Sequence, residues 1–318
     1  MVRLKIVGLL ILLVIIGILF PWLPLEREKT DTSPFKQVGE MSSARYNSTS
    51  AEFAGKVYTF GGARSAGDWT DEILMFDPRS NKVLTVGHLP LARSGMTSVV
   101  FGDYIYLFGG WDNFLAYSKD ILRFSPRSNK IEKVGELPFG RNYATGAEVG
   151  GKIYIFGGEN NLDQSISDIV QFDPATNKAS TLTISLPYSV NGSTATSYNR
   201  KIYIFGGTTK KAGDVASILM FDPDSGTISV AASLPKPNCA SLAVVVGKMV
   251  YIIGGYSDYW GLFSDVIAFN PQSNEVKVVT TIPIKMAAHS GAAVGKNVYL
   301  MSGKEIYRMK NLVSIRGV

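Results

Sequence analysis

Three arginines recur along the first half of the chain at intervals of 48 residues, namely Arg45, Arg93 and Arg141. A guanidinium group presents its N–H donors in a fixed fork, which suits it to the carboxylate groups of a ligand. The same donors can instead hydrogen-bond neighbouring loops of the chain itself. The three arginines are therefore candidate binding residues, with a structural role as the alternative.

Aromatic residues that fall in polar segments form a second candidate group. Its members, with the acid that flanks them, are Trp69, Trp111, Asp112, Tyr117, Tyr259 and Trp260. Aromatic rings in loops suit a protein interface or stacking on sugar rings. The alternative is that these rings fold down over neighbouring strands as local plugs.

The residue types that most enzymes need are scarce. The 318 residues include one cysteine and two histidines, too few for an intrachain disulfide or a cysteine-based zinc site. The net charge of +6 comes from scattered residues, without a basic run for nucleic acid. We expect no metal, no cofactor and no nucleic-acid partner, and we favour a role without catalysis.

An internal repeat supplies the elements that position these residues. Segments such as KVYTFGG and KIYIFGG recur, and their first glycines are Gly61, Gly109, Gly157, Gly206 and Gly254. An aromatic-X-Pro segment (FDP, FSP or FNP) and then a Leu-Pro or Ile-Pro pair follow each double glycine at fixed spacing. Each repeat predicts four short antiparallel strands with two apolar faces, which become stable only when repeats stack radially.

The two ends of the chain complement each other. A sixth copy, NVYLMSG, lacks the fourth-strand segment, while residues 35–41 (FKQVGEM) align with residues 131–137 (IEKVGEL) at a constant offset. We predict an all-β, six-bladed propeller whose last blade contains three C-terminal strands and one N-terminal strand. Such closure removes the open edge of the sheet series.

The double glycine after a Tyr-containing strand, the Asp-Pro after an aromatic residue and the Leu-Pro pair resemble the kelch repeat, over about residues 35–310. The resemblance implies that the loops between strands two and three, and those between one blade and the next, share one face. In peptide-binding kelch propellers, arginines at the places of Arg45, Arg93 and Arg141 contact acidic ligands, which implies a cationic arc. Many kelch repeats also begin the fourth strand with a tryptophan, whereas this chain has its tryptophans in the loops.

The first 25 residues differ from the rest of the chain. Residues 6–25 are apolar and follow Arg3 and Lys5, and as a helix they would span about 30 Å, the thickness of a bilayer core. We predict one N-terminal transmembrane helix within residues 1–25, a linker over 26–34, the kelch propeller over 35–310 and a tail over 311–318. The basic flank puts the N-terminus in the cytoplasm and the propeller in the periplasm or at the cell surface. The alternative is a cleaved secretory signal, although no small residues lie between Phe20 and Glu28.

The leading functional hypothesis is a membrane-anchored extracytoplasmic propeller. It would bind a protein or a glycan on its loop face, or serve as an accessory subunit of a membrane complex. The alternative is a sugar-acting enzyme similar to sialic-acid mutarotases of the kelch type, which would use the arginines with Glu52 and Glu148.

Overall fold

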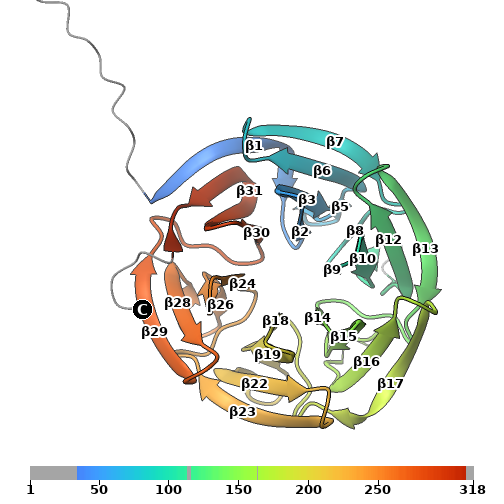
Figure 1. Cartoon of the computed structure of the whole chain (residues 1–318), viewed down its shortest axis with the longest axis vertical. Coiled ribbons are helices and arrows are strands. Elements are labelled where there is room, and N and C mark those ends of the chain that lie inside the picture. The colour runs from blue at the N-terminus through green and yellow to red at the C-terminus, as the bar shows by residue number, and fades with distance from the viewer. Residues whose placement is uncertain (1–33, 113–115, 163, 313–318) are drawn as a thin grey trace, which may run out of the picture. The chain divides into compact units, whose positions relative to one another are not determined.

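Each copy of the repeat folds into one antiparallel sheet, as its apolar segments and turn residues predict. In the first copy the order across the sheet is β2 (Thr49–Phe53), β3 (Lys56–Phe60), β6 (Glu72–Asp77) and β7 (Lys82–His88). The computed structural model describes residues 34–112, 116–162 and 164–312. Within these ranges six sheets stand around a common axis as the blades of a propeller (Figure 1). The prediction of an all-β, six-bladed propeller is confirmed.

The next four blades repeat the order of the first. The strands nearest the axis are β9 (Thr97–Phe101), β14 (Thr145–Val149), β18 (Thr194–Tyr198) and β24 (Leu242–Val246). The second strands are β10 (Tyr104–Phe108), β15 (Lys152–Phe156), β19 (Lys201–Phe205) and β25 (Met249–Ile253). The third strands are β12 (Asp120–Ser125), β16 (Asp168–Asp173), β22 (Ser217–Asp222) and β28 (Asp265–Asn270). The outermost strands are β13 (Lys130–Glu136), β17 (Lys178–Ser185), β23 (Thr227–Ser233) and β29 (Glu275–Thr281).

Short strands in the loops show which loops lie together. They are β4 (Ala63–Ser65), β5 (Asp68–Trp69), β8 (Arg93–Ser94), β11 (Trp111–Asp112), β20 (Thr208–Thr209), β21 (Gly213–Asp214), β26 (Tyr256–Ser257) and β27 (Gly261–Leu262). The pairing of β8 with β11 joins a loop between two blades to a loop between strands two and three. These two classes of loop therefore share one face, which we call the loop face.

The last blade closes the ring with the start of the chain. It contains β30 (Ser290–Val294), β31 (Asn297–Met309) and β1 (Phe35–Arg45), and β1 pairs with β31 from Phe35↔Met309 onwards. The predicted N-terminal strand is confirmed. The blade differs from the prediction in having three strands within the described residues, because β31 serves as both its second and its third strand. Its first half, up to Met301, pairs with β30, and its second half, from Gly303, pairs with β1.

The predicted transmembrane helix requires a correction. Throughout the described ranges the chain is built from strands, and no helix there is long and apolar enough to cross a membrane. A propeller blade needs short strands that expose alternate side chains, so the propeller itself offers no such helix. Residues 1–25, on which the prediction rested, lie outside the described residues.

Aromatic pairs fill the interfaces between blades. In four of the five aromatic-X-Pro segments the phenylalanine packs on the phenylalanine that precedes the double glycine of the previous blade, whereas Phe76 packs on Tyr299. The ring centroids are 5.3 Å apart in Phe60–Phe124, 5.6 Å in Phe108–Phe172, 5.5 Å in Phe156–Phe221 and 5.6 Å in Phe205–Phe269. Each pair contributes about 1 kcal/mol beyond the burial of its rings. Phenylalanine thus fills the space between blades, and tryptophan is not needed there.

The double glycine marks the closest approach between neighbouring blades. Gly61 and Gly62 have positive φ angles of 56° and 100°, and the Gly62 N–H donates to the carbonyl of Arg93 at 3.0 Å. A Cβ atom on Gly61 would stand 2.3 Å from the same carbonyl oxygen. Only glycine combines this backbone conformation with this contact.

A closed ring of backbone hydrogen bonds surrounds the axis on the loop face. One residue of each blade donates its N–H to the carbonyl of the residue in the preceding blade, at 2.8–3.0 Å. These residues are Asn47, Gly95, Tyr143, Gly192, Ala240 and Ala288, all with positive φ angles. The ring ties all six blades together independently of the sheets.

Candidate functional site

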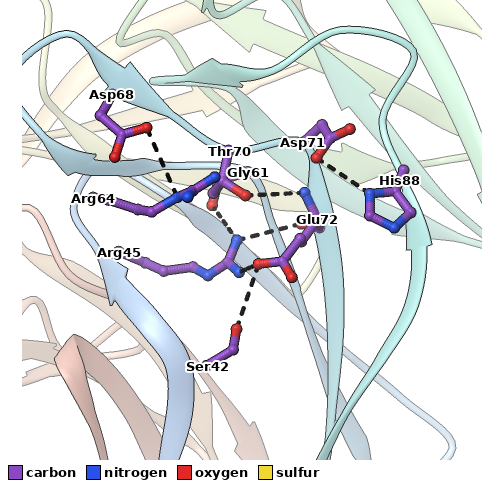
Figure 2. Close-up of polar contacts among 9 residues, drawn as sticks. All are labelled: Ser42, Arg45, Gly61, Arg64, Asp68, Thr70, Asp71, Glu72 and His88. Carbon is purple, nitrogen blue, oxygen red and sulfur yellow. Dashed lines mark hydrogen bonds and ion pairs between the residues drawn. The ribbon is translucent and has the colours of Figure 1, made fainter.

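Arg45 lies where the chain passes from the last blade into the first. Its side chain is fully buried, and Nη1 donates to the Gly61 carbonyl at 3.1 Å. Nη2 forms an ion pair with the carboxylate of Glu72, which Ser42 Oγ also approaches at 3.4 Å (Figure 2). The guanidinium group therefore contacts the first blade.

Arg93 and Arg141 repeat this arrangement in the second and third blades. Each donates to the carbonyl of the first glycine of its double glycine, and each pairs with the first residue of the third strand. The nitrogen–oxygen distances are 2.9 Å from Arg93 to Asp120 and 3.0 Å from Arg141 to Asp168. Both arginines are at most 2% exposed.

The backbone of each arginine also contacts the preceding blade. The carbonyl of Arg93 accepts from Gly62 at 3.0 Å, and that of Arg141 accepts from Gly110 at 2.9 Å. An arginine in this place thus joins one blade through its carbonyl and the next through its side chain. This geometry favours the structural role, and contact of the three arginines with an acidic ligand stays a prediction.

The ion pairs keep these buried charges in place. Burial lowers the pKa of the Arg45 and Arg141 guanidinium groups, while Glu72 and Asp168 act in the opposite direction. Burial acts to raise the pKa of Asp120, but Lys133 and Arg93 outweigh it and the pKa lies below its usual value. The acids therefore offset part of the cost of burying the arginines.

The structure divides the predicted aromatic residues into two groups. In the first, Trp69 of the first blade packs at a tilt of 53° against Trp111 of the second, with ring centroids 5.2 Å apart, and Trp111 meets Tyr117 at 6.1 Å. All three side chains are half-buried. Asp112 is buried, and its carboxylate accepts from the Ala116 N–H at 3.2 Å. This group covers the edges of two blades, as the plug alternative predicts.

The second group stands out into solvent. Tyr259 is 84% exposed and Trp260 is 52% exposed, and both lie at the tip of the hairpin between β26 and β27. Their rings pack edge to face with centroids 4.9 Å apart. Leu262, which is 45% exposed, follows in the same hairpin. We call Tyr259, Trp260 and Leu262 the blade-five patch.

Polar contacts hold the blade-five patch in position. Lys236 Nζ lies 5.2 Å from the centroid of the Trp260 ring and 3.9 Å from a carboxylate oxygen of Asp265. The Asp258 N–H donates to Asp214 Oδ2 of the fourth blade at 2.6 Å. The hairpin is therefore attached to two blades while its aromatic tip remains exposed.

The glutamates considered for acid–base chemistry have local partners. Glu52 accepts from the Gly55 N–H at 2.6 Å, and Glu148 accepts from the Gly151 N–H at 2.8 Å. Each carboxylate thus stabilises the tight turn after its own strand. The structure gives them a role in the hairpins and does not pair them with each other.

His289 is a buried residue that directly precedes β30, the strand of the last blade nearest the axis. Burial lowers its pKa to about 4, and neither ring nitrogen has a hydrogen-bond partner in the described part of the chain. The imidazole of His289 lines a cavity of about 110 Å³ beside the six backbone hydrogen bonds that surround the axis. Its imidazole is therefore neutral at neutral pH.

A larger cavity, which no sequence motif predicted, lies on the third blade. It has a volume of about 590 Å³, and its lining includes Phe139, Asn160, Leu162, Asp168 and Thr181. These residues come from a junction between blades, a loop and two strands, so no single motif marks the site. The available signal was a difference between repeats, because the second blade has Lys133 where the third has Thr181.

The residue types that hold metals do not gather in the parts of the chain that the structure describes. Over residues 34–112, 116–162 and 164–312, no three or more His, Cys, Asp and Glu side chains are placed to hold a metal ion. Burial raises the pKa of the Cys239 thiol to about 12, so this thiol is protonated at neutral pH.

Comparisons with known proteins agree with this architecture. A family model described as the KLHDC2/KLHL20/DRC7 Kelch-repeats domain matches residues 127–303, and a Kelch motif model matches residues 92–138. A solved structure described as "Structure of YjhT" is 18% identical with a TM-score of 0.65, and the match covers 73% of this chain and 83% of that one. This likeness supports the fold alone, and no curated protein matches the chain. With more than half of its length matched by the family model, the chain belongs to the KLHDC2/KLHL20/DRC7 kelch-repeat family.

Proposed function

We propose that the protein is a binding module without catalytic activity, and that the blade-five patch is the centre of its docking surface for a partner protein. The observation that carries this proposal is the exposure of Tyr259 (84%) and Trp260 (52%) on a hairpin fixed to two blades. Kelch propellers commonly mediate protein interactions. Tyr and Trp are also the residues most enriched among those that dominate binding energy at protein interfaces.

The patch has the properties of a preorganised anchor. Lys236 and the Asp258–Asp214 contact restrict the hairpin before a partner arrives. Binding then orders few side chains, which lowers its entropic cost. The half-buried Trp69 and Trp111 offer less free ring surface, so we assign them a packing role.

A glycan is the second candidate ligand. Aromatic rings bind sugars by presenting a flat face, and Tyr259 and Trp260 meet at an interplanar angle of 77°. The pair therefore forms a knob more than a platform, which favours a pocket on a protein as its complement.

The contacts of its candidate residues favour the alternative of a sugar-acting enzyme less than a binding role. Arg45, Arg93 and Arg141 are buried in ion pairs, and Glu52 and Glu148 hold their own hairpins. Substituting these residues would change the stability of the blades before it changed any chemistry.

The proposal includes export of the propeller from the cytoplasm. Its support is the run of apolar residues from 6 to 25 behind Arg3 and Lys5. Fusion of a reporter that is active only outside the cytoplasm to the C-terminus of the full chain tests this part. An inactive reporter on a folded, expressed protein would contradict it.

The binding proposal is tested by cross-linking the full chain in its own cells and identifying the proteins attached to it. The variant Tyr259→Ser/Trp260→Ser is expected to weaken the partner's affinity by about 30-fold, as losing an interface anchor does. The matched control is Leu84→Ser/Val230→Ser, which removes exposed apolar side chains from the outer strands β7 and β23. Equal recovery of the same partner with both variants would overturn the proposal.

A further inference from the structure

The cavity on the third blade lies beside a carboxylate that lacks one of its partners. Asp168 Oδ2 accepts from Arg141 at 3.0 Å, while Oδ1 is buried and has no donor among the described residues. A buried acceptor without a donor destabilises the protein, so such an oxygen normally has a partner. The Asp168 side chain is 19% exposed and lines the cavity.

The second blade shows what this place accommodates. Its carboxylate, Asp120, pairs with Arg93 through Oδ2 at 2.9 Å and with Lys133 Nζ through Oδ1, also at 2.9 Å. One aspartate at the start of the third strand therefore holds a guanidinium group and an ammonium group together. The second cation comes from the outer strand of the same blade.

The fifth blade brings a cation to the same place from another direction. Lys236 directly follows Pro235 at the junction between blades, and its Nζ lies 3.9 Å from Asp265 Oδ2. Asp265 has the same position in its blade as Asp120 and Asp168. The second and fifth blades thus each place a lysine ammonium group beside the aspartate that begins their third strand, and the two lysines come from different segments of the repeat.

The third blade has neither lysine. Thr181 occupies the position of Lys133, and Phe139 occupies the position of Lys236. The space beside Asp168 is the cavity of about 590 Å³, which is within the range of small-molecule sites. Phe139 (42% exposed) and Leu162 (73% exposed) give this cavity apolar walls.

We propose that this cavity binds a primary alkylammonium group, either a lysine side chain of another protein or a free amine. The ammonium donates to Asp168, and the alkyl chain packs against Phe139 and Leu162. Because the carboxylate torsion of an aspartate is soft, Oδ1 can turn toward the donor. Lys133 has a second acid, Glu136, at 2.6 Å, whereas Ser185 stands at that position in the third blade. Because the third blade has no second acid at that position, we expect the ammonium group to bind with modest affinity.

The test is calorimetric titration of the full chain with pentylammonium and with Nα-acetyl-lysine amide. Their uncharged counterparts, pentanol and Nα-acetyl-norleucine amide, are the matched probes. We expect saturable binding of at least one ammonium probe with a dissociation constant of about 1 mM or lower, and none of the uncharged probes. Binding of the lysine derivative alone identifies a protein lysine as the ligand, and binding of both probes identifies amines in general.

Two lysine substitutions distinguish binding at this cavity from a general effect of added positive charge on probe binding. Thr181→Lys recreates the ion pair of the second blade inside the third and is expected to weaken probe binding at least about tenfold. Val230→Lys adds the same charge at the same position of the fourth blade, where Ser217 replaces the aspartate, and is expected to leave binding unchanged. The proposal is overturned if neither ammonium probe binds, if the uncharged probes bind equally, or if Thr181→Lys binds like the wild type. The residues differ from those of the blade-five patch, so either proposal can fail alone.

Discussion

At the scale of single residues, the blades show which residues can replace the buried ion pair of the repeat. The first three blades have an arginine and, 27 residues later, an acid that pairs with it. The fourth blade has Val190 and Ser217 at the same two places, and the fifth has Asn238, whose amide donates to the Gly254 carbonyl at 2.9 Å. An apolar residue is therefore tolerated where the acid is also absent.

This exchange predicts the outcome of a double substitution. Arg141→Val leaves the partly buried charge of Asp168 without its partner, and we expect the free energy of unfolding to fall by about 2–4 kcal/mol. Arg141→Val/Asp168→Ser reproduces the fourth blade and is expected to recover to within about 1 kcal/mol of the wild type. Urea unfolding measures both variants. Arg127→Ala, which removes an exposed ion pair with Asp103, is the control and should change stability by less than about 1 kcal/mol. A double variant no more stable than the single one would contradict the assigned role.

The buried His289 predicts how stability depends on pH. Its pKa is lowered from 6.5 to about 4 in the folded protein, so between these values the unfolded chain binds the additional proton. Stability is then complete above pH 6.5 and decreases as the pH falls toward 4, by about 3 kcal/mol in total. His289→Ser, which places there the residue of three other blades, should flatten this part of the profile. His88→Ser is the exposed control and should retain it, and equal profiles for all three proteins would show that His289 is not the titrating group.

At the scale of strands and loops, the sequence predicted what its repeats specify locally. The double glycines, the aromatic-X-Pro segments and the segment at residues 35–41 recur at nearly constant spacing, and all of them form the expected strands and turns. The arginines and the acids that pair with them also recur at a constant spacing in the sequence. Their pairing was recognised only from contacts in the structure, such as that between Arg45 and Glu72.

The exposure of the aromatic residues in the loops could not be predicted from the sequence in the same way. Trp111 is covered because Trp69 of another blade meets it, whereas no aromatic ring of another blade covers Tyr259 among the residues that the structure describes. That difference depends on the angle between adjacent loops, which no local pattern encodes. The cavity beside Asp168 was missed for a related reason, since it arises from two lysines that the third blade lacks.

At the scale of the whole propeller, two independent devices close the ring. One is the pairing of β1 with β31, which joins residues from the two ends of the described chain. The other is the ring of six backbone hydrogen bonds around the axis, in which Asn47 of the first blade donates to Ala288 of the last at 2.9 Å. The loop face, and with it both proposed binding sites, keeps its geometry only while the ring is closed.

Hydrogen–deuterium exchange of the full chain tests this closure most directly. Residues 35–41 of β1 occupy the same position in their blade as residues 131–137 in and just after β13, so each amide has a matched reference. We predict that the two segments are protected to a similar degree, because stable sheet pairing shields amides from exchange. Rapid exchange throughout residues 35–41, with residues 131–137 still protected, would show that the N-terminal strand does not close the propeller.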